Sequence, residues 1–259
     1  MTTYVAGIDI GSATSKATIL ADDKIVGENL IATGPASRGS AEAVMAVALE
    51  RAGLSADDIS VTVATGYGRI NVPFADKVVT EIACHAMGVH FLFPAARTVL
   101  DMGGQDCKAI RVDKAGDHVA FVMNDKCAAG TGRFFDVMSS VLKVPLTDLG
   151  PLALEAASEP VISSMCTVFA RTEVTRLLRK GIPKADILGG LYEATSNRVV
   201  NLVKRVGIES DFAISGGVAK NIGMVRKIEE KVGLKACIAD EPQTVGSLGA
   251  SLFARELLV

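Results

Sequence analysis

Two segments of this chain, 92 residues apart, carry the same pattern of residues. The first reads GIDIGSATSKA over residues 7–17, and the second reads VLDMGGQDCKA over residues 99–109. They align without gaps, so that Asp9 falls on Asp101 and Lys16 on Lys108. Internal similarity of this kind predicts two copies of one supersecondary unit, and it therefore constrains the fold more than any other feature of the chain.

Each copy consists of an apolar run, an aspartate, a glycine-containing turn and a second short run. This pattern predicts a β-hairpin whose turn presents bare backbone N–H groups. Such groups can cradle a phosphate, and a neighbouring carboxylate can hold its Mg²⁺, usually through water. A single copy would fit an ordinary hairpin, but two copies in register favour a clamp that holds a nucleoside triphosphate from both sides.

The composition excludes several classes of partner. The 259 residues are enough for one large domain or two small ones, and 49% of them are hydrophobic, so a substantial core is expected. A net charge of −2 gives no electrostatic reason to bind nucleic acid or an anionic membrane. The chain has no tryptophan, which argues against a platform for stacking bases.

The chain also lacks the sequence signs of a membrane or secreted protein. No apolar stretch is long enough to span a bilayer, and the N-terminus enters a strand at once, without a signal segment. Five cysteines, an odd number, argue against a disulfide framework. We therefore expect a cytoplasmic protein.

The predicted elements alternate between strands and helices in two similar halves. In the first half we expect strands at 5–10, 15–20, 25–31 and 61–64, with helices at 40–51 and 77–87. Ser40 is expected to cap the first helix, and Gly53 and Gly88 are expected to end the two helices. In the second half we expect strands at 98–101, 107–112, 118–123, 212–214 and near 237, with helices at 132–142, 168–180, 184–206, 221–232 and 247–257.

This α/β plan resembles the superfold shared by actin, sugar kinases and heat-shock ATPases. Its hairpin, third strand and helices occur twice, and an aspartate ends each first strand. The resemblance implies two related subdomains around a nucleotide cleft, the first formed by residues 1–95 and 245–259 and the second by residues 96–244. Ser215-Gly216-Gly217 matches the place where that superfold lets the backbone approach adenosine.

Two cysteines stand where helices are expected to begin. Cys127 lies in a loop that opens a helix, and Cys166 directly precedes another. The positive end of a helix stabilises a thiolate, and two such ligands from each subunit of a twofold dimer would make a four-cysteine iron–sulfur site. However, the two cysteines are 39 residues apart and the chain has no Cys-x-x-Cys, so their spacing also fits ordinary buried cysteines.

Five motifs together resemble one family. They are GIDIGS at 7–12, TGYGR at 65–69, DMGGQD at 101–106, NDKCAAGTGRF at 124–134 and SGG at 215–217. In this order they closely resemble the activator ATPases of 2-hydroxyacyl-CoA dehydratases, kin to the ATPase subunits of benzoyl-CoA reductase. The resemblance covers essentially the whole chain, and the segment around Cys127 is its most specific part.

The resemblance implies an ATP hydrolase that is coupled to electron transfer. In that family a homodimer holds one [4Fe–4S] cluster between its subunits, and Cys127 and Cys166 match its ligands. Hydrolysis of ATP, bound with Mg²⁺, drives a conformational change, and one low-potential electron passes to the partner dehydratase. A reduced ferredoxin or flavodoxin supplies that electron.

The predicted site residues fall into two groups. As catalytic residues we expect Asp9, Asp101 and Gln105, of which Gln105 would orient the attacking water. As nucleotide-binding residues we expect Gly11, Ser12, Ala13, Thr14, Lys16, Gly103, Gly104, Gly130, Gly132, Gly216 and Gly217. We interpret the remaining cysteines, Cys84, Cys107 and Cys237, as packing residues, and the histidines His85, His90 and His118 as structural.

Two alternatives remain open. An ATPase subunit of a benzoyl-CoA reductase-like complex would share the motifs but would work in a hetero-oligomer. A small-molecule kinase of the same superfold would need a substrate pocket with a carboxylate base and would have no use for a pair of cysteines.

Overall fold

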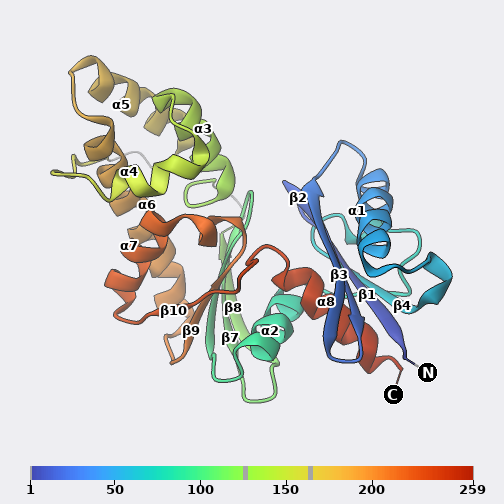
Figure 1. Ribbon diagram of the computed structural model, residues 1–259. Coiled ribbons are helices and arrows are strands. Elements are labelled where there is room, and N and C mark those ends of the chain that lie inside the picture. The colour runs from blue at the N-terminus through green and yellow to red at the C-terminus, as the bar shows by residue number, and fades with distance from the viewer. Residues whose placement is uncertain (1, 125–127, 163–165, 259) are drawn as a thin grey trace.

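The computed structural model describes residues 2–124, 128–162 and 166–258, which form two similar halves side by side (Figure 1). The sheet of the first half consists of β1 (Tyr4–Ile10), β2 (Thr14–Ala21), β3 (Lys24–Ala32), β4 (Ile59–Thr65) and β5 (Lys77–Val78). The sheet of the second half consists of β6 (Thr98–Met102), β7 (Cys107–Val112), β8 (His118–Asn124), β9 (Phe212–Ser215) and β10 (Ala236–Cys237).

The two sheets have the same topology. Their strand orders are β3-β2-β1-β4-β5 and β8-β7-β6-β9-β10, and in each sheet an antiparallel three-strand unit continues into a parallel pair. Asp9 pairs with Lys16 across the first hairpin, and Asp101 pairs with Lys108 across the second. The predicted repeat is therefore confirmed down to the register of its hairpins.

Two helices lie between the sheets (Figure 1). Helix α8 (Val245–Glu256) packs on the first sheet, and α2 (Glu81–Leu92) packs on the second sheet and on α8. A Cβ on Gly7 of β1 would stand 2.0 Å from the Ser247 carbonyl, so glycine is what allows β1 to approach the backbone of α8. On its opposite face the first sheet packs α1 (Ser37–Ala52) against Ile8 and Ile10.

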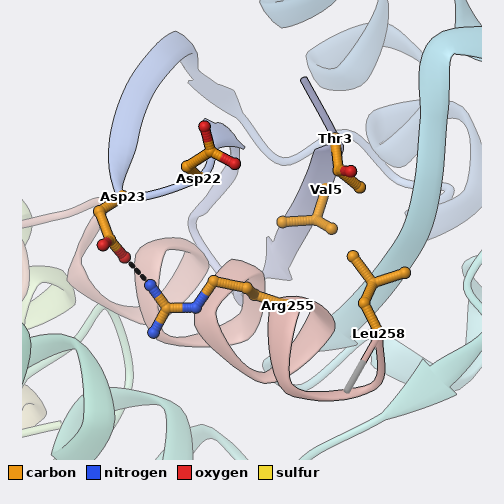
Figure 2. Close-up of a pocket in the computed structure, with 6 residues that line it drawn as sticks. All are labelled: Thr3, Val5, Asp22, Asp23, Arg255 and Leu258. Carbon is orange, nitrogen blue, oxygen red and sulfur yellow. Dashed lines mark hydrogen bonds and ion pairs between the residues drawn. The ribbon is translucent and has the colours of Figure 1, made fainter. Parts of the chain in front are cut away.

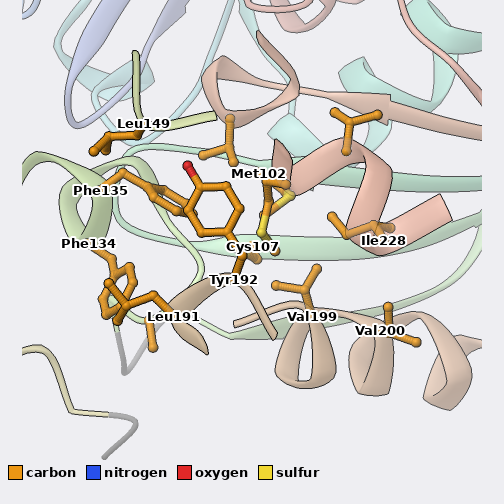
Figure 3. Packing of buried hydrophobic residues seen from close by; sticks show 14 of the residues in the cluster. Met102, Cys107, Phe134, Phe135, Leu149, Leu191, Tyr192, Val199, Val200 and Ile228 are labelled. Carbon is orange, nitrogen blue, oxygen red and sulfur yellow. The ribbon is translucent and has the colours of Figure 1, made fainter. Parts of the chain in front are cut away.

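Further helices cover the described part of the second half, and its core is larger than that of the first. They are α3 (Gly132–Leu142), α4 (Leu149–Ala153), α5 (Thr167–Arg179), α6 (Lys184–Val206) and α7 (Ile222–Val232). Phe135 of α3 and Tyr192 of α6 meet edge to face with ring centroids 5.4 Å apart (Figure 3). Cys107 lies buried in the same core, which confirms its interpretation as a packing residue.

Three predicted helix boundaries are wrong, one of them because Lys77–Val78, the expected start of the second helix, form strand β5. The first helix begins at Ser37, and Ser40 lies inside it, where its hydroxyl accepts a hydrogen bond from the Gly34 N–H. The second helix covers Glu81–Leu92, so Gly88 does not end it. A Cβ at Gly88 would stand 2.3 Å from the Val245 carbonyl, which shows that this glycine serves the close contact between α2 and α8.

Within the residues that the structure describes, none of the helices combines the length and the apolar character needed to cross a bilayer.

Candidate functional site

Two buried carboxylates mark equivalent places in the two halves. Asp9 near the end of β1 is 5% exposed, and Asp101 near the end of β6 is 3% exposed. Across the parallel pairs, Asp9 stands opposite Thr65, the last residue of β4, and Asp101 stands opposite Ser215, the last residue of β9. The carboxyl ends of neighbouring strands therefore build each half-site in the same way.

A left-handed glycine packs against each carboxylate. Gly66 and Gly216 have φ angles of 82° and 83°. A Cβ on Gly66 would stand 2.2 Å from Asp9 Oδ1, and a Cβ on Gly216 would stand 2.8 Å from Asp101 Oδ1. Only glycine fits these places, because both the backbone angle and the space exclude a side chain. The TGYGR segment thus lies directly against Asp9.

The two hairpin lysines lie among carboxylates. Lys16 Nζ donates to Asp9 Oδ2 at 2.9 Å, and both side chains are buried. Lys108 Nζ donates to Asp106 Oδ1 at 2.7 Å and lies 3.5 Å from Asp101 Oδ2. These contacts balance the buried negative charge that two aspartates would otherwise leave uncompensated.

The charges around Asp101 keep this carboxyl ionised. Burial alone would raise its pKa, but His85, Lys108 and Lys16 outweigh burial and hold the pKa below its ordinary value. For Lys108 burial alone would lower the pKa, but Asp101 and Asp106 raise it above the ordinary value, so this lysine keeps its charge. The second half-site therefore presents a carboxylate at neutral pH, as a hydrated cation requires.

Helix α2 adds two residues that the sequence analysis did not assign to the site. Glu81 Oε1 lies 3.5 Å from Lys108 Nζ, and Glu81 Oε2 lies 3.5 Å from Arg69, so Glu81 joins the two halves. One turn later, His85 Nδ1 lies 3.0 Å from Ser215 Oγ. The signal in the sequence was their spacing of four residues, which places both on one face of a helix.

The two glycine turns meet each other. A Cβ on Gly104 would stand 2.6 Å from the Cβ of Ala13 and 3.4 Å from Ser12 Oγ. The first turn closes on itself through the Gly11 N–H, which donates to the Thr14 carbonyl at 3.0 Å. The structure thus brings the two predicted phosphate loops into contact.

The second turn is also bonded to the start of α3. The Gly132 N–H donates to the Gly103 carbonyl and the Arg133 N–H donates to the Gly104 carbonyl, both at 2.9 Å. The thiol of Cys107 donates to the Gly130 carbonyl at 3.2 Å. Any shift of the second turn must therefore move the segment that opens α3.

The remaining predicted residues of the nucleotide site lie nearby or at the rim. Gln105 is exposed on the second turn, and the Gly216 N–H donates to the Pro242 carbonyl at 2.8 Å. A Cβ on Gly217 would stand 3.3 Å from the Gln243 amide. The described residues thus fit a Mg²⁺-bound nucleotide, with two buried aspartates and two glycine turns.

A separate cavity lies away from this site. It has a volume of about 450 Å³ and is lined by Thr3, Val5, Asp22, Asp23, Arg255 and Leu258 (Figure 2). Arg255 forms an ion pair with Asp23 across it. Since Val5 lies near the start of β1 and Asp9 near its end, the cavity opens at the far end of the first sheet from the carboxylates.

The cysteine Cys166 is exposed and stands at the N-cap of α5. Val168 and Phe169 in the first turn of α5 are 68% and 65% exposed, and Val161, five residues before Cys166 in the sequence, is 87% exposed. Helices α3 and α5 pack against each other (Figure 1). The other predicted ligand, Cys127, lies outside the described residues. Within residues 2–124, 128–162 and 166–258, no group of three or more His, Cys, Asp or Glu side chains could hold a metal ion.

Repeated sheets, paired aspartates and facing glycine turns define a protein of the actin, sugar-kinase and heat-shock ATPase superfold. A glucokinase of the ROK family from Streptomyces griseus, solved with glucose and AMPPNP, has the same fold, with a TM-score of 0.61 at 15% identity over 98% of this chain and 99% of its own. The predicted fold class is therefore confirmed.

The model of the BadF/BadG/BcrA/BcrD ATPase family matches residues 6–254, so the chain belongs to this family. It is 48% identical to the activator of lactoyl-CoA dehydratase from Anaerotignum propionicum, over 98% of both chains. It is 30% identical to one of the subunits of benzoyl-CoA reductase from Thauera aromatica, over 97% of this chain and 93% of that one.

Two solved structures are much more similar than the glucokinase. Component A of (R)-2-hydroxyglutaryl-CoA dehydratase from Acidaminococcus fermentans has a TM-score of 0.93 and 44% identity, over 98% of both chains. The activator of 2-hydroxyisocaproyl-CoA dehydratase from Clostridium difficile, with bound ADPNP, has a TM-score of 0.93 and 41% identity, over 98% of this chain and 95% of that one. The resemblance on which the family was predicted is confirmed.

Proposed function

We propose that this protein is an ATP-dependent one-electron donor that activates a 2-hydroxyacyl-CoA dehydratase. Two subunits would share one [4Fe–4S] cluster, with Cys127 and Cys166 of each subunit as ligands. The observation that carries the proposal is the backbone bonding of the second glycine turn to the start of α3, because it links the nucleotide cleft to a cysteine-bearing segment.

The nucleotide would lie between the two glycine turns. The turns at residues 11–14 and 103–104 would hold its phosphates through backbone N–H groups other than those of Gly11 and Gly103, which donate within their own hairpins. Asp9 and Asp101 would hold its hydrated Mg²⁺. Lys16 and Lys108 lie close enough to the carboxylates to exchange them for phosphate oxygens. Gln105 on the second turn would orient the attacking water, and Gly216 and Gly217 would let the backbone approach adenosine.

Cys166 supports the cluster assignment by its place in the fold. It is exposed at the N-cap of α5, where the helix dipole favours an anionic ligand set. The cluster would supply a low-potential one-electron carrier. Each subunit offers half of the four thiolates, so a twofold interface through this face would complete the site.

The apolar side chains around Cys166 support such an interface. Val161, Val168 and Phe169 are large, apolar and mostly exposed in the single chain. Exposed apolar side chains in the same helical turn as a ligand that needs a second copy, as Val168 and Phe169 are, favour a homodimer contact over open surface. Since α5 packs on α3, closure of the cleft would reorient both helices together.

Closure would give ATP its control over the cluster. A ligand shifts a conformational equilibrium only through differential affinity for its states, and ATP and ADP differ by the phosphate that both turns would hold. A dehydratase that acts on a 2-hydroxyacyl-CoA, as named for the similar activators, would then receive the electron. A reduced ferredoxin or flavodoxin in the cytoplasm would supply it.

Iron content tests the proposal most directly. Protein purified anaerobically should be a dimer with about four irons, following the four-thiolate rule. Cys127→Ala and Cys166→Ala should each abolish the brown chromophore, whereas Cys237→Ala, on β10 away from α5, should retain it. Normal iron in both of the first two variants would contradict the cluster assignment and favour a kinase. A requirement for a second kind of subunit would favour the benzoyl-CoA reductase-like complex.

Nucleotide control is tested by chelation of iron. ATP, unlike ADP, should change the rate at which an iron chelator removes the cluster from the anaerobic dimer. Equal rates with ATP, with ADP and without nucleotide would argue that hydrolysis is not coupled to the cluster.

A further inference from the structure

His85 lies beside Ser215 and Asp101 of the second half-site. Its sequence context did not suggest this position. Its ring projects from α2, is 6% exposed and reaches the second half-site. Its Nδ1 atom lies 3.0 Å from Ser215 Oγ and 3.6 Å from Asp101 Oδ1. The ring therefore contacts the residue that stands beside Asp101 in the parallel pair.

His85, Ser215 and Asp101 form a series of two hydrogen bonds, and the single proton of the Ser215 hydroxyl fixes the direction of both. The Ser215 hydroxyl has one proton and donates it to Asp101 Oδ1 at 3.1 Å. Ser215 Oγ must then accept its bond from His85, so Nδ1 carries a proton. Both the neutral Nδ1–H tautomer and the charged ring satisfy this order, and the order therefore does not depend on the charge of His85.

The other ring nitrogen faces the first half-site. A Cβ on Gly246 of α8 would stand 3.0 Å from His85 Nε2 and 3.2 Å from Asp9 Oδ2. Because Gly246 has no side chain, nothing from α8 separates the ring from the Asp9 carboxylate at this point. One imidazole ring thus reaches toward both predicted catalytic aspartates.

The contact between α2 and α8 places the ring. Helices α2 and α8 contact each other reciprocally, since a Cβ on Gly88 would meet the Val245 carbonyl and a Cβ on Gly249 would meet the Cys84 carbonyl. His85 and Gly246, each directly after one of these carbonyls, face each other across this contact. The ring lies in the space that Gly246 leaves, so α8 holds it between the two half-sites.

We propose that His85 is a positioning residue of the Mg²⁺–nucleotide site, acting on Asp101 through Ser215. The chain from Nδ1 through the Ser215 hydroxyl fixes Oδ1 of Asp101 and so orients its carboxylate. If Asp9 holds a hydrated Mg²⁺, the Nε2 atom would be a hydrogen-bond partner for one of the water molecules of that ion. The inference rests on the proposed function only in that the cleft binds Mg²⁺ with a nucleotide.

Binding of ADP with and without Mg²⁺, measured by titration calorimetry on the purified protein, separates positioning from packing. His85→Ala and Ser215→Ala should each weaken binding of ADP with Mg²⁺ about tenfold, the effect of one lost hydrogen bond to a charged group. Binding of ADP without Mg²⁺ should not change. His85→Asn, whose amide nitrogen can stand where Nδ1 stands, should restore binding to within about threefold.

The double variant His85→Ala/Ser215→Ala tests whether His85 acts through Ser215. If it does, the double variant binds no more weakly than either single variant, because the two residues act as one unit. His90→Asn, on the same helix but packed on Gly116, is the matched control and should bind like the wild type. The same order should appear in the Mg²⁺ concentration needed for half-maximal ATP hydrolysis.

The opposing results are distinct. Additive losses in the double variant, or equal losses with and without Mg²⁺, would overturn the positioning role. Unchanged binding in both alanine variants, beside a wild type that needs Mg²⁺, would also overturn it and leave the proposed function standing. A wild type that binds ADP no better with Mg²⁺ would instead remove the Mg²⁺–nucleotide site, and the inference with it.

Discussion

The two hairpins share their register, but their lysines make different contacts. Lys16 donates directly to Asp9, the residue opposite it in the hairpin. Lys108 stands in the same register with Asp101 but donates to Asp106 instead. Asp106 aligns with Thr14 of the first copy, so the second copy has one more carboxylate at this place. The replacement of Thr14 by Asp106 at this position thus decides which carboxylate accepts the shortest hydrogen bond from the hairpin lysine.

The two aspartates are therefore held in different ways. Asp9 has one short contact to a lysine, whereas Asp101 has a hydroxyl donor and two cationic or ionisable side chains at 3.5–3.6 Å. The duplication fixes where the carboxylates stand, and the residues that differ between the copies fix what else each one contacts. Equivalent backbone positions in the two halves can thus have different roles, because the two copies keep the same backbone while their side chains differ.

The largest effect should follow from removing either carboxylate. Asp9→Asn and Asp101→Asn should each reduce Mg²⁺-dependent ATP hydrolysis about a hundredfold, because an amide holds a hydrated cation poorly. Steady-state hydrolysis checks this, and the iron content should stay at the wild-type level. If only one variant loses activity, the two half-sites do not act as a clamp; if neither does, the nucleotide lies elsewhere.

The same two variants should differ in stability. Asp9→Asn leaves the buried Lys16 without its short contact, and should lower the free energy of unfolding by about 3 kcal/mol. Asp101→Asn should cost about 1.5 kcal/mol, because Lys108 keeps Asp106 and Glu81. Denaturant unfolding of the apo protein measures both values. Equal losses would show that the two lysines are equally dependent on their opposite aspartates.

The contribution of Asp101 should also depend on pH. Folding lowers the pKa of this carboxyl, so its ionisation stabilises the folded state above its unfolded pKa, near 3.9. That stability is lost as the pH falls through the folded pKa. The difference between the wild type and Asp101→Asn should thus be present at about pH 5 and shrink below about pH 4.

Chemical denaturation at each pH tests this sign, with the exposed Asp57→Asn as the matched control. A difference that grows as the pH falls would mean that burial, rather than the surrounding cations, dominates the pKa of Asp101.

Local patterns predicted most of the fold. The repeat located both hairpins with their register, and helical periodicity gave α3 and α6 with their observed ends. The errors arose where tertiary contacts decide. Gly88 looks like a helix stop but lies at the contact with α8, and Ser40 looks like a cap but accepts its bond from Gly34 within the loop before the helix.

The site was predicted in part for the same reason. Aspartates and glycines beside strand ends carry a local signature, and the structure places them together. Glu81 and His85 share only a helical spacing of four residues, because their contacts arise only where α2 packs between the two sheets. Three parts of the sequence analysis stay predictions: the cluster ligands, the roles of the site residues, and the subdomain boundaries at 95, 96, 244 and 245. They concern bound groups and relative motions, which the structure of a single chain without ligands does not test.

The smallest effect separates the hydroxyls that flank the two aspartates. Ser215 bonds Asp101 and His85, so Ser215→Ala should lower the free energy of unfolding by about 1 kcal/mol. Thr65 stands in the equivalent place beside Asp9, but its buried hydroxyl has the Cys84 thiol as its neighbour instead of an imidazole and a carboxylate. A thiol is a weak hydrogen-bond partner, so Thr65→Val should change stability by less than about 0.5 kcal/mol.

If that hydroxyl serves the ligand, Thr65→Val should instead weaken binding of ADP with Mg²⁺ by about tenfold, the effect of one lost bond to a charged group. Paired unfolding and calorimetric titrations of the two variants check this division between stability and binding. The comparison fails if Thr65→Val destabilises the apo protein as much as Ser215→Ala does. In that case both hydroxyls are structural, and the asymmetry of the half-sites lies in their lysines alone.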